Sequence, residues 1–316
     1  MALDFNKRVV VLVGGVGGAK LAYGLARVLP PELLTVVVNV ADDFWHYGLK
    51  ICPDSDTIMY TLAGVVDPVN GWGVSGDTTA ALEMLGRYGG ETWFRLGDRD
   101  IATHLQRTQM LASGQRLTQV TAALARALGV EHPILPVTDA PLSTMVDTVE
   151  YGELAFQTYF VRHRWQPTVR GLRYAGLDQA EVTPEVAQAL ESADVVLFGP
   201  SNPWLSLEPV LGVRGLRERL VGRDIPRAAI TPIIGGDAVK GPAAKIMREL
   251  DYTVSAQTVA AYYGDAINGF VDDTRNPAFT AEGVRVLRMD TLMQTDAHKV
   301  ALAEHVLSWI MRWDGR

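Results

Sequence analysis

Uninterrupted runs of apolar residues, rather than alternating ones, mark the first strands that this chain predicts. Residues 8–13 and 33–39 are rich in valine and leucine and have almost no polar break. Runs of that kind are typical of strands buried on both faces, as in a parallel sheet covered by helices. Residues 19–29, between them, carry apolar positions at helical spacing. The chain therefore begins with a β-α-β unit, which predicts a right-handed crossover and a parallel sheet.

The same alternation of helices and strands continues along the chain. Helical spacing predicts helices at residues 57–62, about 78–88, 101–112, 118–128, 183–190 and 296–313. We expect Asp77 and Asp100 to cap the second and third of these helices. Short apolar runs predict further strands at residues 133–137, 194–198, 227–231 and 284–287. Residues 39–57 are expected to form a polar loop.

Between residues 139 and 180 the pattern changes to short strands joined by turns. Residues 145–149, 154–160 and 169–174 predict antiparallel strands. The basic run at residues 162–164 is interpreted as a solvated strand end rather than a phosphate site. The predicted fold is thus α/β, a mainly parallel sheet with helices on both faces. Residues 1–138 and 181–316 form this core, and residues 139–180 form a small antiparallel and helical insert.

Composition and charge narrow the range of functions. The 316 residues are 48% hydrophobic and 21% charged, which suits a large globular α/β protein. The formal net charge of −7 argues against a general surface for nucleic acid or for an anionic membrane. The single cysteine, Cys52, rules out an internal disulfide and fits a reducing compartment. No segment resembles a signal peptide or a membrane span, so we expect a soluble, cytoplasmic protein.

A glycine-rich loop joins the first predicted strand to the first helix. It contains Gly14, Gly15, Gly17 and Gly18, and Lys20 follows them. A strand, a glycine loop and a helix N-terminus together let backbone N–H groups face an anion such as phosphate. The spacing matches neither the dinucleotide fingerprint nor a Walker loop, so a simple tight turn stays an alternative.

Two more loops rich in glycine or proline follow predicted strands, at residues 199–203 and 232–236. In a parallel sheet they share one edge with the first glycine loop, and the three can form a single crevice. We interpret this crevice as a nucleotide site, with ordinary loop punctuation as the alternative. The candidate nucleotide-binding residues are Gly14, Gly15, Gly17, Gly18, Lys20, Ser201 and Asn202.

Four aspartates follow the second strand: Asp42, Asp43, Asp54 and Asp56. Carboxylates gathered at a ligand-binding edge repel one another unless a cation neutralises them, and Mg²⁺ prefers hard oxygen ligands. We therefore predict a magnesium site and take Asp42, Asp43 and Asp54 as its candidate ligands. Capping of the following helix accounts for at most one of the four. The alternative is a set of scattered surface carboxylates.

A second polar group surrounds residues 97–100. Arg95 and Arg99 suit contact with a phosphate or a ring oxygen, although Arg99 can equally pair with a neighbouring aspartate. His104 is as consistent with packing as with catalysis. Four aromatic residues in these loops suit stacking on a planar heterocycle or else belong to the core: Trp45, Tyr47, Trp72 and Trp93.

Several longer motifs are similar to those of one family, the 2-phospho-L-lactate transferases of coenzyme F-420 biosynthesis, and the similarity covers nearly the whole chain. The motifs are GGVGGAK at residues 14–20, NVADD at 39–43, GLKICPDSDT at 48–57, LGDRD at 96–100 and GPSNP at 199–203. The resemblance implies a Rossmann-like core, dependence on Mg²⁺, phosphotransferase activity and a homodimer.

The resemblance also implies a reaction. Family members move a phospholactyl or phosphoenolpyruvyl group from a guanosine diphospho donor to the ribityl hydroxyl of the deazaflavin 8-hydroxy-5-deazariboflavin, and GMP leaves. It places Asp56 and Arg95 at the acceptor, and Asp98, Arg99 and His104 join them as candidate substrate-binding residues. Asp56 and Asp43 are the candidate catalytic residues, with Asp56 expected to accept the ribityl proton.

Two other functions are weighed against transfer. The related gluconeogenesis-factor proteins share this fold, bind nucleotide-sugar-like ligands and act as regulators, but residues 14–20 and Arg95 are closer to the transferases. A dehydrogenase is a poorer interpretation, because Asn39 ends the second strand where an acidic residue is expected and no Gly-x-Gly-x-x-Gly occurs. The sequence does not distinguish lactyl, enolpyruvyl and glyceryl donors.

Overall fold

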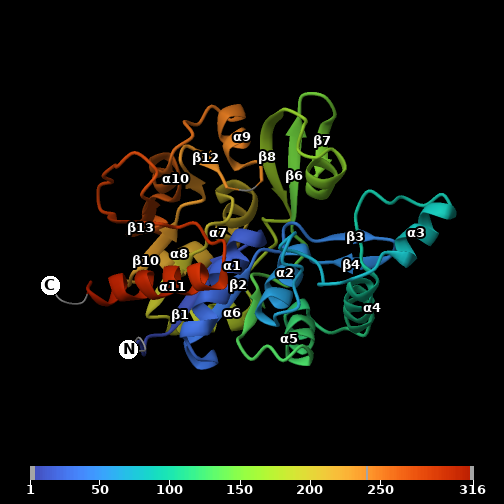
Figure 1. Ribbon diagram of the computed structural model, residues 1–316, viewed down its shortest axis with the longest axis horizontal. Helices are drawn as coiled ribbons and strands as arrows, with labels where there is room; N and C mark the ends of the chain where they lie inside the picture. The colour runs from blue at the N-terminus through green and yellow to red at the C-terminus, as the bar shows by residue number, and fades with distance from the viewer. Residues whose placement is uncertain (1–3, 240, 314–316) are drawn as a thin grey trace.

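The computed structural model describes residues 4–239 and 241–313, and its centre is a seven-stranded sheet (Figure 1). The strand order is β14-β13-β10-β9-β1-β2-β5, and every neighbouring pair runs parallel. The strands are β1 (Val9–Val13), β2 (Leu34–Val38), β5 (Ile134–Pro136), β9 (Val195–Phe198), β10 (Arg227–Ile230), β13 (Gly269–Asp273) and β14 (Arg285–Met289). The predicted parallel sheet is confirmed.

Helices cover both faces of this sheet, because its central strands are apolar on both sides. Val9, Val11 and Val13 of β1 face a core shared with α1, α2 and α11, whereas Val10 and Leu12 face a core shared with α6 to α10. These helices are α1 (Gly15–Val28), α2 (Pro53–Leu62), α6 (Pro184–Ser192), α7 (Glu208–Gly212), α8 (Leu216–Val221), α9 (Ala243–Glu249), α10 (Ala256–Tyr263) and α11 (Asp296–Met311). The Rossmann-like α/β class is confirmed.

The strand order changes direction between β1 and β9, where the chain leaves the β1-β2-β5 half and returns to build the other half. At such a switch point the loops after adjacent strands diverge and leave a crevice at the carboxyl edge of the sheet. The glycine loop follows β1 and residues 199–202 follow β9. The two predicted loops therefore meet where an α/β sheet most often binds ligands.

The insert is a three-stranded antiparallel sheet of order β7-β6-β8 (Figure 1). It consists of β6 (Ser143–Thr148), β7 (Gly152–Ala155) and β8 (Val169–Ala175). The strand predicted at residues 154–160 is wrong beyond Ala155, since a π-helix, η2 (Thr158–Arg162), replaces it. Phe156, Tyr159 and Phe160 recur at helical rather than alternating spacing, which turns Phe156 and Tyr159 toward the core. The division of the chain into two domains stays a prediction.

Residues 39–57 are more ordered than a polar loop. They contain an antiparallel hairpin of β3 (Phe44–His46) and β4 (Leu49–Ile51), and α2 begins at Pro53 rather than Thr57. The hairpin turns at Tyr47 and Gly48, whose φ angles are 51° and 73°, the left-handed pair that a two-residue hairpin turn requires. Figure 1 shows β3 and β4 extending from the core toward α3 (Ala80–Arg87) and α4 (Asp98–Ala112).

The remaining elements are shorter and mostly escaped prediction. They are α5 (Leu117–Ala127), β11 (Ile233–Ile234), β12 (Asp237–Ala238), η1 (Pro31–Leu33), η3 (Pro203–Leu207) and η4 (Gly264–Ala266). Of these only α5 was expected, and β13, α9 and α10 were also missed. Among the residues described, no helix combines the length and the apolar character that crossing a bilayer requires.

Candidate active site

A cavity of about 590 Å³ opens at the carboxyl edge of the sheet, beside the switch point. One wall is the glycine loop with residues 200–202, and a second is the start of α2 with Asp100 and His104 of α4. A third wall comes from the insert, and the loops before α3 and α4 add aromatic side chains. Residues 232–236 do not line this cavity; Gly241 and Pro242 do. A crevice therefore lies where it was predicted, but residues 232–236 are not part of its wall.

The glycine loop is the N-terminus of α1, which begins at Gly15 rather than Ala19. The Gly14 N–H donates to Ser201 Oγ (3.1 Å) and the Gly15 N–H to Asp54 Oδ1 (2.8 Å). The N–H groups of Val16 and Gly17 belong to the first helical turn, which has no intrahelical acceptor for them, and both residues line the cavity. These two donors at the positive end of the α1 dipole are what the loop offers an anion.

Close packing explains part of the glycine pattern. A Cβ at Gly17 would lie 2.4 Å from the carbonyl oxygen of Pro200, and one at Gly18 would lie 2.7 Å from Val13 Cβ. The loops after β1 and β9 can therefore meet only because these positions lack side chains. The glycines were interpreted as letting a phosphate approach the backbone. Gly17 and Gly18 are also needed for the packing of the loop itself, whether or not a ligand is bound.

Gly17→Ala should lower both stability and nucleotide affinity. The added methyl group must displace the Pro200 backbone, and overpacking of this kind costs about 1–3 kcal/mol. Thermal unfolding and calorimetric titration with GDP measure the two effects. Gly171→Ala is the matched control, since nothing lies within 4 Å of the Cβ it would gain. Equal stability of the two variants would contradict this account of the loop.

The other predicted nucleotide-binding residues divide into two groups. Ser201 Oγ donates to the Gly14 carbonyl (2.7 Å) and holds the glycine loop. Asn202 Oδ1 accepts from the N–H groups of η3, whereas its Nδ2 is buried without a partner among the described residues and the side chain borders the cavity. Lys20 Nζ donates to the Met293 carbonyl (2.8 Å), and neither Lys20 nor Gly18 lines the cavity.

Three buried carboxylates lie next to the glycine loop. Burial raises the pKa of Asp54 to about 6, although Asn39 and the Gly15 N–H donate to it. Burial also raises the pKa of Asp43 to about 6, against the opposing charge of Lys50 at 3.7 Å. Asp42 has its pKa raised well above the usual value, first by burial and then by Asp54.

These carboxylates suit a divalent cation. Asp42 Oδ1 and both oxygens of Asp43 are buried and find no hydrogen-bond partner among the described residues, an arrangement that is costly for an ionised group. Asp42 and Asp54 line the cavity, whereas Asp43 does not. Hard oxygen donors whose negative charge is only partly compensated are what Mg²⁺ binds, so the residues present fit that ion.

Asp56 lies in a different network, built on Arg107 of α4. The two terminal nitrogens of the Arg107 guanidinium donate to the two carboxylate oxygens of Asp56, with Nη1 at 3.1 Å from Oδ2. Arg107 is only 1% exposed. Burial raises the pKa of Asp56, and the positive charge of Arg107 opposes that effect. Burial acts to lower the pKa of Arg107, but the negative charge of Asp56 outweighs it and the pKa is raised. Asp56 is thus held in one orientation at the cavity wall.

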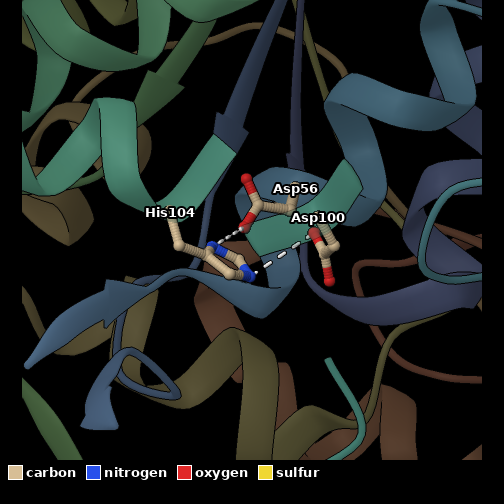
Figure 2. Close-up of side chains that lie close together, drawn as sticks. All are labelled: Asp56, Asp100 and His104. Carbon is tan, nitrogen blue, oxygen red and sulfur yellow. Dashed lines mark ion pairs between the residues drawn. The ribbon is translucent and has the colours of Figure 1, made fainter. Parts of the chain in front are cut away.

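His104 lies between two carboxylates, as Figure 2 shows. Its Nδ1 is 3.6 Å from Asp56 and 3.1 Å from Arg107 Nη1, and its Nε2 is 3.4 Å from Asp100 Oδ1. Because arginine can only donate, Nδ1 accepts, and the ring proton of a neutral imidazole is on Nε2, facing Asp100. Asp100 also accepts from Tyr60 Oη at 2.8 Å. Burial opposes ionisation of Asp100, yet the contacts with His104 and Tyr60 keep its pKa below the usual value.

Asp56, Asp100 and His104 offer ligand atoms within 4.8 Å of one another, close enough to share a metal ion. No group of this kind forms from Asp42, Asp43 and Asp54 among the described residues. However, Arg107 already donates to both oxygens of Asp56 and to His104 Nδ1. A cation there would have to displace a guanidinium, and an imidazole is a poor ligand for Mg²⁺. The predicted metal ligands stay a prediction.

The turn at residues 97–100 owes its shape to two aspartates that cap each other's helices. Asp98 accepts from Ala80 N (3.1 Å) and Ala81 N (2.9 Å) of α3, whereas Asp77 accepts from Arg99 N and Asp100 N of α4. The caps predicted for Asp77 and Asp100 were wrong, because α3 takes its cap from Asp98 at the start of α4, and α4 takes its cap from Asp77, which precedes α3. Arg99 is exposed, donates to Ser75 O (3.2 Å) and does not line the cavity.

Aromatic side chains border the cavity near Arg95. Trp72, Trp93 and Phe94 line it together with Arg95, and the rings of Phe44 and Phe94 meet edge to face at 4.8 Å. Trp45 and Tyr47 are exposed on the β3–β4 hairpin, outside the cavity. Two of the four expected aromatic residues are thus in position to stack on a planar ligand.

Sequence reasoning missed four residues that shape the site: Arg107, Tyr60, Phe160 and Arg164. Tyr60 and Arg107 sit at helical spacing in α2 and α4, where they are indistinguishable from packing or surface residues. Phe160 and Arg164 border the cavity from the insert, for which the sequence predicted no part in the site. One signal was available, since Arg107 follows His104 by three residues and so shares its helix face.

Comparison with known proteins supports one family. The family model described as 2-phospho-L-lactate transferase CofD matches residues 9–306. A 2-phospho-L-lactate transferase of Methanosarcina mazei is 39% identical over 302 residues, covering 94% of this chain and 99% of the relative. A phosphoenolpyruvate transferase of Streptomyces griseus is 39% identical over 303 residues, covering 93% and 95%. A solved UPF0052 family protein of Bacillus halodurans matches with a TM-score of 0.64 at 14% identity, over 98% of this chain and 100% of that one, which shows a shared fold.

Proposed function

This chain belongs to the 2-phospho-L-lactate transferase family, and we propose that it transfers a phospholactyl or phosphoenolpyruvyl group to 8-hydroxy-5-deazariboflavin in coenzyme F-420 biosynthesis. The donor is a guanosine diphospho compound and GMP is released. The observation that carries this proposal is the single cavity that joins the N-terminus of α1 to a wall of buried aspartates and aromatic rings. Relatives of nearly equal similarity are named for lactate and for pyruvate groups, so the donor acid stays open.

The donor's diphosphate belongs at the glycine loop. The free N–H groups of Val16 and Gly17, and the unpartnered Nδ2 of Asn202, are donors that suit phosphate oxygens. Asp42 and Asp54, together with Asp43, would hold Mg²⁺. The bound ion would neutralise the charge of the diphosphate. Ser201 acts here through the glycine loop that it holds.

The acceptor belongs at the aromatic part of the cavity wall, where Trp72, Trp93 and Phe94 provide flat apolar surface and Arg95 a fixed fork of donors. Asp56 takes the proton from the terminal ribityl hydroxyl. The oxygen then attacks the phosphorus that carries the organic acid, and the bond from that phosphorus to the GMP oxygen breaks. Most of the catalysis is positioning and charge neutralisation, as in other phosphoryl transfers.

The two acceptor-side residues should affect different kinetic constants. Asp56→Asn keeps the size of the side chain but removes the proton acceptor, so kcat should fall by about a hundredfold or more. Arg95→Gln should instead raise KM for the deazaflavin by about tenfold, because a charged hydrogen bond is lost. Steady-state kinetics measure both, and Arg126→Gln on the outer face of α5 is the control. Wild-type constants in both variants would refute the roles given to Asp56 and Arg95, whereas no transfer by the wild-type chain would favour a regulator instead.

We also propose a homodimer, on the resemblance, and a cytoplasmic protein that binds neither nucleic acid nor membrane, on the net charge of −7 and the single cysteine. Light scattering of the purified chain gives its mass in solution. A monomeric mass at micromolar concentration would end that part of the proposal.

A further inference from the structure

The cavity contains two arginines that have no hydrogen bond or ion pair with any described residue, Arg95 and Arg164. Most other charges at the site are engaged: Asp56 with Arg107, Asp54 with Asn39, Asp100 with Tyr60. Even Arg162, two residues from Arg164, pairs with Glu91 at 3.1 Å. Four carboxylates line the same cavity, so these two guanidinium groups are its available positive charge for an anionic ligand.

Arg164 occupies an unusual backbone conformation. Its φ angle is 50° and that of Trp165 is 55°, a left-handed pair in side-chain-bearing residues. The turn follows the π-helix η2 and is fixed by hydrogen bonds from Trp165 N to Tyr159 O (2.9 Å) and from Gln166 N to His163 O (3.1 Å). Left-handed residues of this kind persist only where the surroundings hold them, and they gather at ligand clamps. Here the turn holds Arg164 at the cavity wall beside Phe160 and Val161.

We propose that Arg164 binds the carboxylate of the organic acid that the donor carries. The inference rests on the proposed function. Phospholactate and phosphoenolpyruvate both have a carboxylate on the carbon that bears the phosphate oxygen, and the aspartates of the cavity would repel it. A guanidinium can meet a carboxylate with two parallel hydrogen bonds. Arg95 stands among Trp93 and Phe94 on the acceptor wall, which leaves Arg164, on the insert, for the donor.

This assignment gives the insert a role in binding the donor, which its sequence did not predict. The carboxylate is common to both donor acids, so Arg164 would select an acidic donor without distinguishing lactyl from enolpyruvyl. GDP has no such carboxylate and should not depend on Arg164. The residue is therefore expected to affect donor recognition, and the constants for the deazaflavin and for GDP should stay unchanged.

The test compares Arg164→Gln, Arg164→Lys and Arg95→Gln in the transfer assay. Arg164→Gln should raise KM for the donor by about tenfold or more, and Arg164→Lys should recover part of the loss because it restores the charge without the fork. Arg95→Gln should show the reverse pattern, with the deazaflavin constant raised. Arg170→Gln is the matched control, an exposed arginine of the insert that pairs with Asp147 at 2.7 Å. A wild-type donor KM in Arg164→Gln would overturn the proposal, as would an equal rise in the GDP inhibition constant.

A second measurement separates this proposal from the proposed function. Calorimetry with phosphoenolpyruvate, in the presence of GMP and Mg²⁺, needs no turnover and no deazaflavin. Binding by the wild-type chain that weakens about tenfold or more in Arg164→Gln supports the carboxylate site, even if no transfer occurs. No binding, or equal binding by both proteins, refutes the carboxylate site while leaving transfer to be judged by the kinetic assay.

Discussion

Replacing Arg107 with methionine should lower the free energy of unfolding by about 3–5 kcal/mol, because it leaves the buried carboxylate of Asp56 without its partner. Arg107 is 1% exposed and Asp56 is 4% exposed, so water replaces the guanidinium poorly. The same change frees Asp56 and His104 Nδ1 to reorient, since Arg107 donates to both. Turnover should fall with stability. Urea unfolding and steady-state kinetics measure the two losses.

The double variant Arg107→Met with Asp56→Leu separates structure from function. An apolar pair of similar volume is often as stable as a buried ion pair, so the double variant should recover most of the lost stability. Its transferase activity should stay absent, because Asp56 is the proposed proton acceptor. Arg107→Lys retains the charge but not the two-nitrogen fork, and it should lie between wild type and Arg107→Met. A loss below about 1 kcal/mol in Arg107→Met would show that this pair does not hold the site together.

Local pattern was enough to predict the parallel core. The runs at β1, β2 and β9 are continuously apolar and bounded by turn residues, so they predict buried strands without any knowledge of tertiary contacts. β13 was missed because only Phe270 and Val271 are apolar in its five residues, and its two aspartates end it at the ligand edge. The hairpin of β3 and β4 was missed because its turn uses Tyr47 before Gly48, a weak hairpin signal.

The sequence predicted site residues only where several polar residues or glycines lie close together in one short motif. The aspartates and glycines cluster within short motifs, and the structure brings most of them to one cavity. Arg107 pairs with a residue 51 positions away, and the reciprocal caps of Asp77 and Asp98 join the loop before α3 to the start of α4. Such contacts depend on how helices pack, so spacing along the chain does not contain them. Arg164 was interpreted as solvated because nothing in its neighbourhood shows that the insert reaches the cavity.

Removal of Mg²⁺ with EDTA should lower the rate of transfer by about a hundredfold or more, while the protein stays folded. Asp42 and Asp54 line the cavity beside the proposed diphosphate site, and the buried oxygens of Asp42 and Asp43 need a cation to be ionised at low cost. Full activity after careful metal removal would contradict the site. Activity is only one measure, since binding of the ion also stabilises the folded chain.

The pH dependence of that stabilisation has a definite sign. The pKa values of Asp43 and Asp54 are raised to about 6 in the folded chain, against 3.8 ordinarily. Without metal, their contribution to stability is therefore full below about pH 4 and is lost as the pH rises through about 6. A cation reverses this loss, because it binds the ionised carboxylates. Mg²⁺ should accordingly raise Tm more at about pH 7.5 than at about pH 5.

Two variants decide which carboxylates bind the ion. Asp42→Asn should remove most of the Mg²⁺-dependent rise in Tm, because it takes away a buried negative charge whose Oδ1 has no hydrogen-bond partner among the described residues. Asp100→Asn should leave that rise intact, whatever its effect on turnover, because Arg107 already satisfies the Asp56 and His104 atoms of that group. The opposite result, with the rise lost in Asp100→Asn and kept in Asp42→Asn, would move the metal to Asp56, Asp100 and His104 and require Arg107 to turn away when the ion binds.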